Sequence, residues 1–530
     1  MDGVGYGYVF NGDSATFVSS KDRPNAVGAV MFDDTNYRYY WQTADDFGET
    51  DILRISYNFR PYIRSEAGNV VLSSTATMVT VNIRYNQSGA YFIEDGVRYY
   101  FYAPTEMGMI TDFVVQVERE GSMYSDASSG DDLNFNLFSY GAGTEDNPYR
   151  LDSADELFNI SRFNSAYYEL ISAIDLSGSN IASRIETNGY IICDEFYGYI
   201  DGGGYSIHGL NTINVNGVSS LALFNSINGA TIKNLIIGAS TEETIISNTF
   251  ANNTQDVLKL GLVAINSTNS TIEDLTVYNL TFIIASNGTL QGDVYIGGLF
   301  ANTTSTTISG CLLVDVDVQF NADFSTGGSY IGGAVANAES TTITSSSSRN
   351  SQINFTLSQG VTNRRFTYIG GAVGYMNGED ARTSGVYDAV VNMNITNIYS
   401  AYIGGIVGFA NKITIDGCTS TGTVTHQGLN VDTNMGGIVG TGQSVIINEA
   451  QVTMEFNIQI VNATRSINIG AVAGVLRTAS TGNVNCQVID CGIGYAFIEQ
   501  TTLTQTGVNQ IGIYGTSTQT NITVSGCYEI

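Results

Sequence analysis

Histidine, tryptophan and proline are scarce in this chain of 530 residues, which holds two His, one Trp and four Pro. A histidine-dependent hydrolase or a His-ligated metal site would have to be built around His208 or His426 alone. Basic residues are few as well, since 21 Lys and Arg face 50 Asp and Glu, for a formal net charge of −29. An acidic chain of this kind repels phosphate backbones, so we expect no nucleic-acid partner.

Long hydrophobic runs are also absent. No stretch of about 18 uninterrupted apolar residues occurs, so we expect no membrane-spanning helix. The first residues carry Asp2 and Asp13 and no basic region, unlike a secretory signal peptide. Ser, Thr, Asn, Gly and Tyr abound while Lys is rare, as on solvated extracellular β-surfaces. We therefore expect an extracellular or cell-surface location for a mature or excised piece, with a cytoplasmic chain as the alternative.

What the chain does contain is an internal repeat built on Tyr-Ile-Gly-Gly. Clear copies begin at Tyr295 (YIGGLF), Tyr330 (YIGGAV), Tyr368 (YIGGAV), Tyr402 (YIGGIV), Asn434 (NMGGIV) and Asn468 (NIGAVA), and weaker ones at Ser220, Lys259 and Gln510. The first Gly of successive copies falls at positions 261, 297, 332, 370, 404, 436, 470 and 512. Each unit of about 35 residues alternates apolar and polar residues like half-buried strands, and it cannot bury its apolar face alone. The repeat therefore predicts an all-β fold, a right-handed parallel β-helix in which the units stack as a solenoid.

The phase of the repeat predicts which side chains stack. Tyr and Ile of the motif must face opposite sides of a strand. The Ile positions therefore predict one interior ladder of Ile296, Ile331, Ile369, Ile403, Met435 and Ile469. The second Gly predicts a close backbone approach at a corner. A later position holds Cys311, Cys418 and Cys527, which we interpret as small buried ladder residues, with a disulfide framework as the competing interpretation.

A change in composition marks the domain organisation, because all four Pro occur at or before Pro148. Residues 1–140 predict an antiparallel β-sandwich-like module, 141–210 a linker, a capping helix and the first strands, and 211–530 the repeats. The helix is expected within DSADELFNISRFNSAYYELISAI, capped by Ser153 or Asp152. Its apolar stripe would be Leu157, Ile160 and Phe163, and it would plug the first rung of the β-helix.

The opening of the array contains GAGTEDNPYRLDSADELFNI, then IDLSG at Ile174–Gly178 and DGGGYSIHGL at Asp201–Leu210. This run resembles the corresponding segment of bacterial GLUG-motif surface proteins. The copy GGIVGFANKITIDGCTSTGTV, at Gly404–Val424, resembles the GLUG repeat itself, including its Gly-Gly start and its Cys position. The resemblance covers about residues 141–530. It implies a secreted or surface-anchored parallel β-helix and says almost nothing of activity.

No catalytic constellation stands out in the sequence. Asp315 and Asp317 lie two apart on a predicted strand and share a face, but the neighbouring repeats supply no carboxylate in that phase. Glu242 and Glu243 lie in a loop, and we interpret all four as solvated surface carboxylates. His208 is interpreted as a satisfied or solvent-facing histidine. We therefore expect no catalytic residue and no enzyme, whereas three or more carboxylates in one lateral groove would favour a polysaccharide-active chain.

Two candidate binding sites remain. In SDASSGDDLN, Asp126, Asp131 and Asp132 offer oxygen ligands to Ca²⁺, although their spacing is not that of an EF-hand and a solvated loop is the competing interpretation. We expect no other cofactor. The second candidate is an aromatic ladder of Tyr295, Tyr330, Tyr368 and Tyr402, which share one phase of the repeat. It predicts either a stabilising stack or a flat platform for a glycan or a protein partner.

Together these features predict an extracellular or cell-surface structural or adhesion protein, whose β-helix is a rigid stalk and interaction surface. One alternative is a polysaccharide-binding or polysaccharide-active β-helix protein. The other is a subunit of an extracellular filament. Ile530 follows Cys527 within a repeat and without a cap, so we expect the native chain to continue or the last rung to self-associate.

Overall fold

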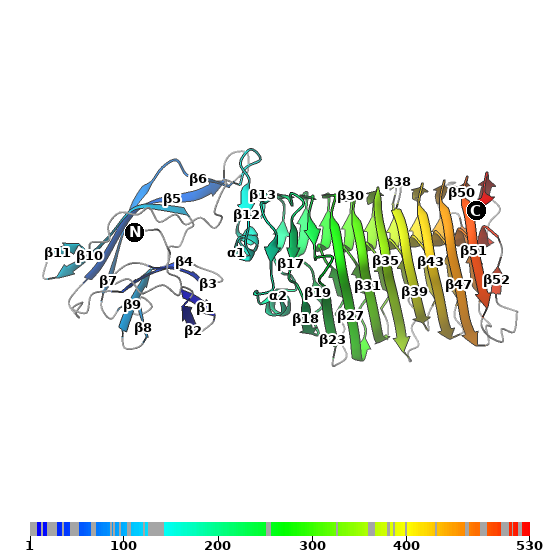
Figure 1. Cartoon of the computed structure of the whole chain (residues 1–530), viewed down its shortest axis with the longest axis horizontal. Helices are drawn as coiled ribbons and strands as arrows, with labels where there is room; N and C mark the ends of the chain where they lie inside the picture. The colour runs from blue at the N-terminus through cyan, green and yellow to red at the C-terminus, as the bar shows by residue number, and fades with distance from the viewer. Residues whose placement is uncertain are drawn as a thin grey trace. The chain divides into compact units, whose positions relative to one another are not determined.

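The computed structural model describes two compact units, Met1–Asn147 and Pro148–Ile530 (Figure 1). The described residues of the second unit, with the end of the first, are 143–250, 256–324, 327–358, 366–378, 382–384, 387–397, 400–429, 432–461, 466–477, 485–499, 508–510, 512–517 and 522–530. Before residue 143 they are the strands given below, residues 73–76 and Gln87.

The described strands of the first unit form two sheets. One runs in the order β2 (Ser14–Phe17), β1 (Tyr8–Asn11), β3 (Ala29–Asp33), β4 (Tyr37–Gln42), β9 (Val97–Tyr102) and β8 (Tyr91–Glu94). The other runs β11 (Ser122–Ser125), β10 (Gly108–Arg119), β5 (Ile52–Arg64) and β6 (Val70–Leu72), with β7 (Thr77–Arg84) also on β5. All neighbours are antiparallel except β1 and β3, which run parallel. The predicted antiparallel N-terminal module is thus confirmed.

The second unit is a parallel β-solenoid of about eight turns, which confirms the predicted β-helix. Each full turn, or rung, gives one strand to each of four stacks. We number these stacks sheets 1 to 4 in chain order, and Figure 1 shows their strands side by side from β13 to β51. The strands of sheets 2 and 3 are three to five residues long, too short for an alternating pattern in the sequence to separate them from turns.

Sheet 1, which carries the Tyr-Ile-Gly-Gly motif, consists of β19 (Ser220–Leu221), β24 (Leu258–Gly261), β28 (Val294–Gly297), β32 (Ser329–Gly332), β36 (Thr367–Gly370), β40 (Ala401–Gly404), β44 (Thr433–Gly436), β48 (Ile467–Gly470) and β52 (Val508–Gln510). Sheet 2 consists of β15 (Cys193–Phe196), β20 (Phe224–Asn228), β25 (Ala264–Thr268), β29 (Phe300–Thr304), β33 (Val335–Glu339), β37 (Val373–Asn377), β41 (Val407–Asn411), β45 (Val439–Gln443), β49 (Ala473–Arg477) and β53 (Tyr514–Ser517).

Sheet 3 begins with β12 (Tyr149–Leu151), β13 (Tyr167–Leu170), β16 (Tyr199–Asp201), β21 (Thr231–Lys233), β26 (Thr271–Glu273), β30 (Thr307–Ser309) and β34 (Thr342–Thr344). It goes on with a separately paired stack, β38 (Arg382–Ser384), β42 (Thr414–Asp416), β46 (Ile446–Asn448), β50 (Cys486–Ile489) and β54 (Ile522–Ser525). Sheet 4 holds β14 (Ile174–Asp175), β17 (Ser206–His208), β22 (Ile236–Ile237), β27 (Thr276–Leu290), β31 (Leu312–Phe324), β35 (Ser346–Ser358), β39 (Tyr387–Asn397), β43 (Thr419–Leu429), β47 (Gln451–Val461), β51 (Gly492–Glu499) and β55 (Tyr528–Glu529), with β18 (Thr212–Asn216) and β23 (Thr244–Phe250) at its side.

The register of sheet 1 follows the predicted repeat. The first Gly of each copy pairs with that of the next from Gly261 to Gly470. The ladder of Ile and Met beside them is at most 1% exposed, as predicted. The last copy departs from the predicted alignment by one residue. Ile469 pairs with Gln510, so Gly512 lies one residue beyond the position that would face Gly470. Gln510 therefore stands where the earlier copies have isoleucine, and the predicted alignment of Gln510-Ile511-Gly512 with the motif was wrong by one residue.

The second Gly of the motif has the predicted close approach. A Cβ built on Gly371 would overlap the carbonyl oxygen of Gly405 on the next rung, and one on Gly405 would overlap that of Gly437. Because the obstacle is backbone, no side-chain movement could relieve it. Glycine is therefore required at Gly371 and Gly405, at the corner between sheets 1 and 2. The same position holds Ala471 and Leu262 on other rungs, where the backbone leaves room for a side chain.

Another corner, between sheets 3 and 4, explains the cysteines. Its residues have φ between 48° and 67° and are Asn234, Asp274, Gly310, Ser345, Gly417, Glu449, Asp490 and Gly526. The next residue on each rung points inward: Leu235, Leu275, Cys311, Ser346, Cys418, Ala450, Cys491 and Cys527. Cys311 and Cys418 are 1% exposed, as predicted, whereas Cys527, which was predicted to be buried as well, is partly exposed because no described rung follows it. Cys491 joins this row although the sequence did not place it there, because a longer connection precedes β50. No disulfide joins the six cysteines, all of which lie in described residues.

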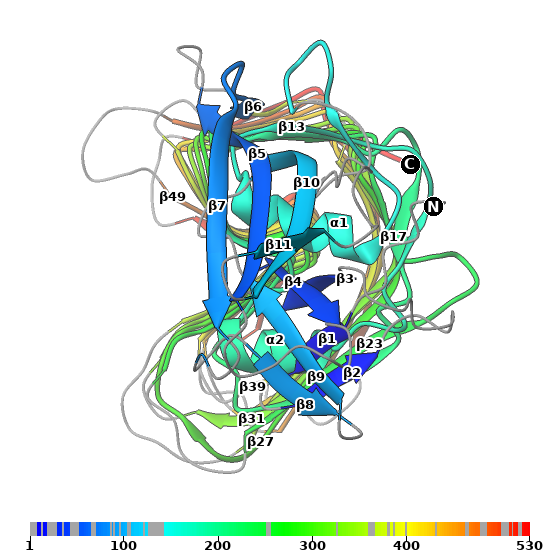
Figure 2. The ribbon, with the colours of Figure 1, turned by 90° about the vertical axis from the view of Figure 1, so that its left-hand side faces the viewer.

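Two short helices lie at the first rungs. The predicted helix is α1 (Ala154–Asn159), followed by a 3₁₀ turn (Ile160–Arg162), and the hydroxyl of Ser153 caps it by accepting the N–H of Glu156. Its predicted apolar residues are at most 6% exposed. Viewed along the solenoid, α1 lies across the interior of the coil (Figure 2).

The second helix, α2 (Ile181–Asn188), was not predicted. It buries Ile181 and Ile185 and packs on β18. The spacing of those two isoleucines and the left-handed Gly189 that follows (φ 78°) were its signals, but eight mostly polar residues did not stand out. None of the described helices is long and apolar enough to cross a membrane.

Candidate functional site

The predicted aromatic ladder stacks along sheet 1. Tyr295, Tyr330, Tyr368 and Tyr402 are register partners on successive strands. The rings of Tyr295 and Tyr330 are 4.5 Å apart and nearly parallel, at 9°. Tyr330 and Tyr368 follow at 5.0 Å, and Tyr368 and Tyr402 at 5.4 Å. The row therefore forms one continuous stack, parallel to the solenoid axis.

Sheet 2 adds aromatic residues that the sequence did not indicate. Tyr375 and Phe409 are register partners whose rings stack at 5.0 Å and 8°. Tyr375 meets Tyr368 edge-on at 5.2 Å, and Phe409 does so at 5.8 Å. The guanidinium of Arg477 lies 5.5 Å from the centre of the Phe409 ring. The signal that could have found them was their alignment with Asn302 and Asn337 in the repeat, but only two rungs carry an aromatic residue there.

Small residues on sheet 2 bring the two sheets together behind the ladder. A Cβ on Gly408 would lie 2.6 Å from the backbone nitrogen of Ile369, and Gly374 and Gly440 make the same kind of approach to sheet 1. At the start of the row, Ala222, Ile265 and Ala301 form a buried cluster. Tyr295 packs against that cluster. The ladder therefore covers an apolar seam on the outside of the coil.

Ring geometry limits what the ladder can bind. Each inner ring lies between two others of the row, Tyr330 between Tyr295 and Tyr368, and Tyr368 between Tyr330 and Tyr402. Burial raises the pKa of the Tyr295, Tyr368, Tyr375 and Tyr402 hydroxyls, and these phenols stay neutral. A neutral phenol both donates and accepts hydrogen bonds. The rings thus stack on one another at rung spacing, about 4.8 Å, and binding of a glycan or a protein partner by this row stays a prediction.

A second candidate site is an open hollow of about 560 Å³ beside the first rungs. Its lining residues come from sheet 3, the corner after it and the first residues of sheet 4: Glu169, Asp201, Gly203, Gly204, Asn234, Ile236, Asp274 and Thr276. Three carboxylates from three different rungs thus meet in one lateral hollow. Sequence reasoning missed them because each lies in a different repeat-free or weakly repeating segment.

The hollow also has a cation and aromatic rings at its edge. Lys233 lies 3.1 Å from Asp201 and 5.3 Å from the centre of the Tyr199 ring. The Tyr199 ring in turn lies 5.4 Å from that of Tyr167. Burial alone would raise the pKa of Asp201, but hydrogen bonds from Asn234 and from the Gly203 N–H, together with Lys233, lower it overall. Asp201 is therefore an ionised acceptor, and hydrogen bonds to Tyr199 and Asp201 raise the pKa of Lys233.

The other carboxylates considered in the sequence lie apart from this lining. Burial raises the pKa of Asp317, and the charges of Asp315 and Glu243 raise it further. The sequence did not foresee that Glu243, from a loop, would approach Asp317. His208 is partly buried, with its Nδ1 3.7 Å from Glu242.

The remaining histidine has no access to solvent. His426 is 0% exposed and lies between Ile395 and Ile458 of the neighbouring rungs. Burial lowers its pKa to about 4, so it is neutral in the folded chain at neutral pH. A side chain in this setting cannot exchange a proton with a substrate.

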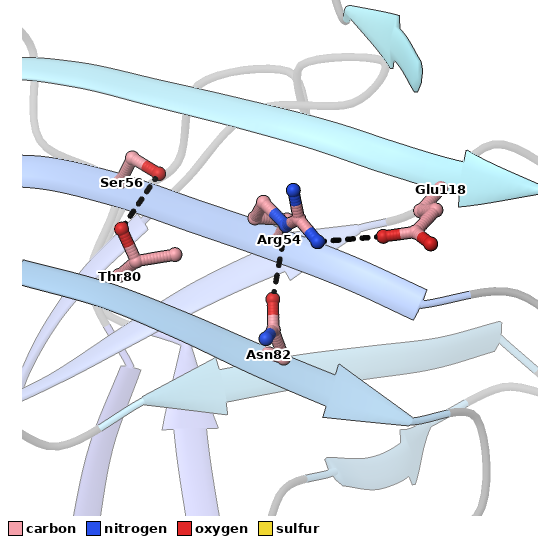
Figure 3. Close-up of polar contacts among 5 residues, drawn as sticks. All are labelled: Arg54, Ser56, Thr80, Asn82 and Glu118. Carbon is pink, nitrogen blue, oxygen red and sulfur yellow. Dashed lines mark hydrogen bonds and ion pairs between the residues drawn. The ribbon is translucent and has the colours of Figure 1, made fainter. Parts of the chain in front are cut away.

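In the first unit, one polar face of the second sheet is tied across three strands. Figure 3 shows Arg54 on β5 between Asn82 of β7 and Glu118 of β10. Its Nε donates to Asn82 over 3.1 Å, and its guanidinium pairs with Glu118 at 2.6 Å. The hydroxyls of Ser56 and Thr80 lie 3.4 Å apart on the same sheet. These groups are part-exposed, and such pairs contribute only about 0–1 kcal/mol each.

The predicted Ca²⁺ ligands, Asp126, Asp131 and Asp132, lie outside the described residues. Among the residues that the structure does describe, no group of three or more His, Cys, Asp or Glu is arranged to hold a metal ion.

No family model and no curated protein matches the sequence. Among solved structures, the chain is similar to one named IgA1 Protease, with a TM-score of 0.31 and 12% identity over 91% of this chain. The chain spans 28% of the length of that protein. A second structure, named Agl-KA catalytic domain, has a TM-score of 0.18 and 9% identity, over 93% of this chain and 90% of that one. Because the first is named as a protease, our prediction that the chain is not an enzyme is contradicted, although a likeness this low carries no argument for an activity.

Proposed function

We propose that this chain belongs to a secreted or cell-surface protein, in which the β-solenoid is a stiff stalk and an interaction surface for adhesion or surface assembly. We propose further that its repeats are of the GLUG type, a resemblance supported by the Gly-Gly corner that they share.

The observation that carries the proposal is the continuous pairing of strands from rung to rung. Successive rungs are joined throughout sheets 1, 2 and 4, and sheet 3 is paired in two stacks, β12 to β34 and β38 to β54. Like side chains stack between rungs. Asn302 bonds to both Asn266 and Asn337, at 3.3 Å each, and Asn468 donates to Asn434 over 2.7 Å. A coil tied this way at every turn resists bending, and its surface presents neutral hydroxyls and amides in rows. Such rows suit a hydroxyl-rich or repetitive partner.

The test is attachment of the full chain to cells and glycans. Beads coated with the full chain are expected to bind a cell type or a glycan class above albumin-coated beads, and the same class should compete in solution. If the beads bind nothing on a broad glycan array or on cells, and the chain also forms no assemblies as its concentration rises, the proposal fails.

A second candidate function, polysaccharide binding at the hollow, is favoured by its three carboxylates, Lys233 and the adjoining tyrosines. Its volume lies within the usual range of ligand sites, about 300–1,000 Å³. Sugar hydroxyls donate well to carboxylates, and Lys233 can donate to a ring or hydroxyl oxygen.

The matched control for this site is Asp416. Like Asp201 it ends a short strand of sheet 3 and accepts a hydrogen bond from an asparagine, here Asn448 at 2.8 Å, yet it lies outside the hollow. Asp201→Asn is expected to lower glycan binding tenfold or more, while Asp416→Asn leaves it unchanged. Equal losses in both variants would exclude the hollow as the binding site.

A further inference from the structure

Cys491 and Cys527 occupy the same inward position on adjacent rungs. Ile489 pairs with Ser525 before them and Gly492 with Tyr528 after them, so the two cysteines are register partners. The N–H of Tyr528 donates to the carbonyl of Cys491 over 3.0 Å, which fixes the rungs together at this point. They are the only pair among the six described cysteines to which the strand registers assign facing positions on neighbouring strands.

The spacing of adjacent strands suits a covalent bond between them. Neighbouring strands lie about 4.8 Å apart, within the 4.4–6.8 Å that Cα atoms span across a disulfide. The two side chains lie close together, since Cys527 is among the groups that raise the pKa of the Cys491 thiol. The thiol of Cys527 also reaches the carbonyl of Val488 on the preceding rung.

The two thiols differ in access, which sets an order of reaction. Cys491 is 0% exposed, whereas Cys527 is partly exposed. A disulfide needs Cβ atoms about 3.5–4.5 Å apart, so the two rungs must close slightly here. The strand that can move is β55, whose two residues are exposed.

We propose that Cys491 and Cys527 are a site of covalent cross-linking, at which a small-molecule disulfide joins the two rungs. The thiolate of Cys527 attacks the small disulfide, forming a mixed disulfide and releasing one small thiolate. The thiolate of Cys491 then attacks Sγ of Cys527, forming the protein disulfide and releasing the second small thiol. The pair loses two electrons and two protons, and the small disulfide is reduced by two electrons. This inference does not depend on the proposed function.

Burial shapes the kinetics of the second step. It raises the pKa of the Cys491 thiol to about 12, so the thiolate that must attack is rare at neutral pH. The mixed disulfide on Cys527 is therefore expected to accumulate first and to convert faster as the pH rises.

The test uses the folded full chain, equilibrated in glutathione buffers of increasing oxidised fraction and then alkylated in denaturant. Two of the six thiols are expected to become protected together, with a loss of 2 Da. Since no Lys or Arg follows Arg477, trypsin leaves all three C-terminal cysteines in one peptide. Chymotrypsin, which cuts after Tyr495 and Phe497, separates Cys491 from Cys527 and reveals the cross-linked pair.

The controls are Cys418→Ser and Cys311→Ser, in the same inward row. Cys418 has Ala450 at its position on the next rung, and Cys311 has Ser346. Both controls should still form the cross-link, while Cys527→Ser, at a partly exposed position, should abolish it. The proposal is overturned if both thiols are alkylated separately at every ratio, if oxidation stops at glutathione on Cys527, or if Cys486 pairs instead.

Discussion

Removal of one ring from the aromatic ladder separates its structural role from a binding role. Tyr330 contacts three rings: Tyr295 at 4.5 Å, Tyr368 at 5.0 Å and, edge-on, Tyr375 at 5.9 Å. Aromatic pairs contribute about 0.5–1.5 kcal/mol each beyond the area that they bury. Tyr330→Ala is therefore expected to lower the free energy of unfolding by roughly 2–4 kcal/mol.

Tyr330→Phe is the matched variant, because it keeps the ring and removes only the hydroxyl. It is expected to cost less than about 1 kcal/mol. The exposed Tyr205, at 42%, serves as the control, and its change to Ala should cost about 0.5 kcal/mol or less. The assay is urea unfolding followed by circular dichroism, with a double-mutant cycle of Tyr330 and Tyr368 to measure their coupling.

Two results would refute this reasoning. A cost of Tyr330→Ala no larger than that of Tyr205→Ala would mean that the stack does not stabilise the coil. A coupling energy near zero between Tyr330 and Tyr368 would mean that their contact contributes nothing. If Tyr330→Phe instead loses glycan or cell attachment while stability is kept, the hydroxyl, and not a ring face, makes the contact.

Two further predictions concern the backbone corner and the buried histidine. Gly371→Ala should destabilise the solenoid by about 3 kcal/mol or more in urea unfolding, because the added methyl meets the carbonyl of Gly405. The control is Gly178→Ala, where nothing lies within 4 Å of the added methyl, and it should change stability by less than about 1 kcal/mol. Equal effects would show that the corner can open. His426 has a folded pKa of about 4, below the usual value near 6.5, so the unfolded chain takes up its proton first as the pH falls. The contribution of His426 to stability should thus be constant above pH 6.5, and stability should fall by about 3 kcal/mol between pH 6.5 and 4. In melts at different pH values, His426→Leu should lack this loss. If the variant loses as much stability in acid as the original chain, His426 is not the group responsible.

The solenoid was predictable because its repeat constrains the same position in every rung. The glycine corner and the inward Ile ladder are each imposed by backbone packing, so one motif determines the registry of a whole sheet. In the described strands of sheet 1, the registry departs from the motif where Gln510 stands at the place of an isoleucine. The short strands escaped prediction because two to five residues carry too little periodicity to be told from turns, and α2 did so because most of its eight residues are polar.

The candidate sites followed a different logic. The tyrosines of sheet 1 were predictable as a row, but the orientation of their rings was not, because stacking depends on contacts from Tyr375 and Phe409 on another sheet. The hollow was invisible because its carboxylates come from rungs that precede the clear copies.

In a regular solenoid, functional sites are expected where the repeat is interrupted. Positions that repeat are fixed by stacking on the neighbouring rungs, because a change in one rung strains the next. Their residues therefore reflect the packing of the coil. Chemistry that a coil does not need must come from residues that break the repeat: the carboxylates and Lys233 of the hollow, or two cysteines that meet only at Cys491 and Cys527. Cys311 and Cys418 fill the same inward position with other residues beside them, and they illustrate the purely structural use. Two thiols on adjacent rungs can form a disulfide with each other, whereas a single cysteine at this inward position cannot.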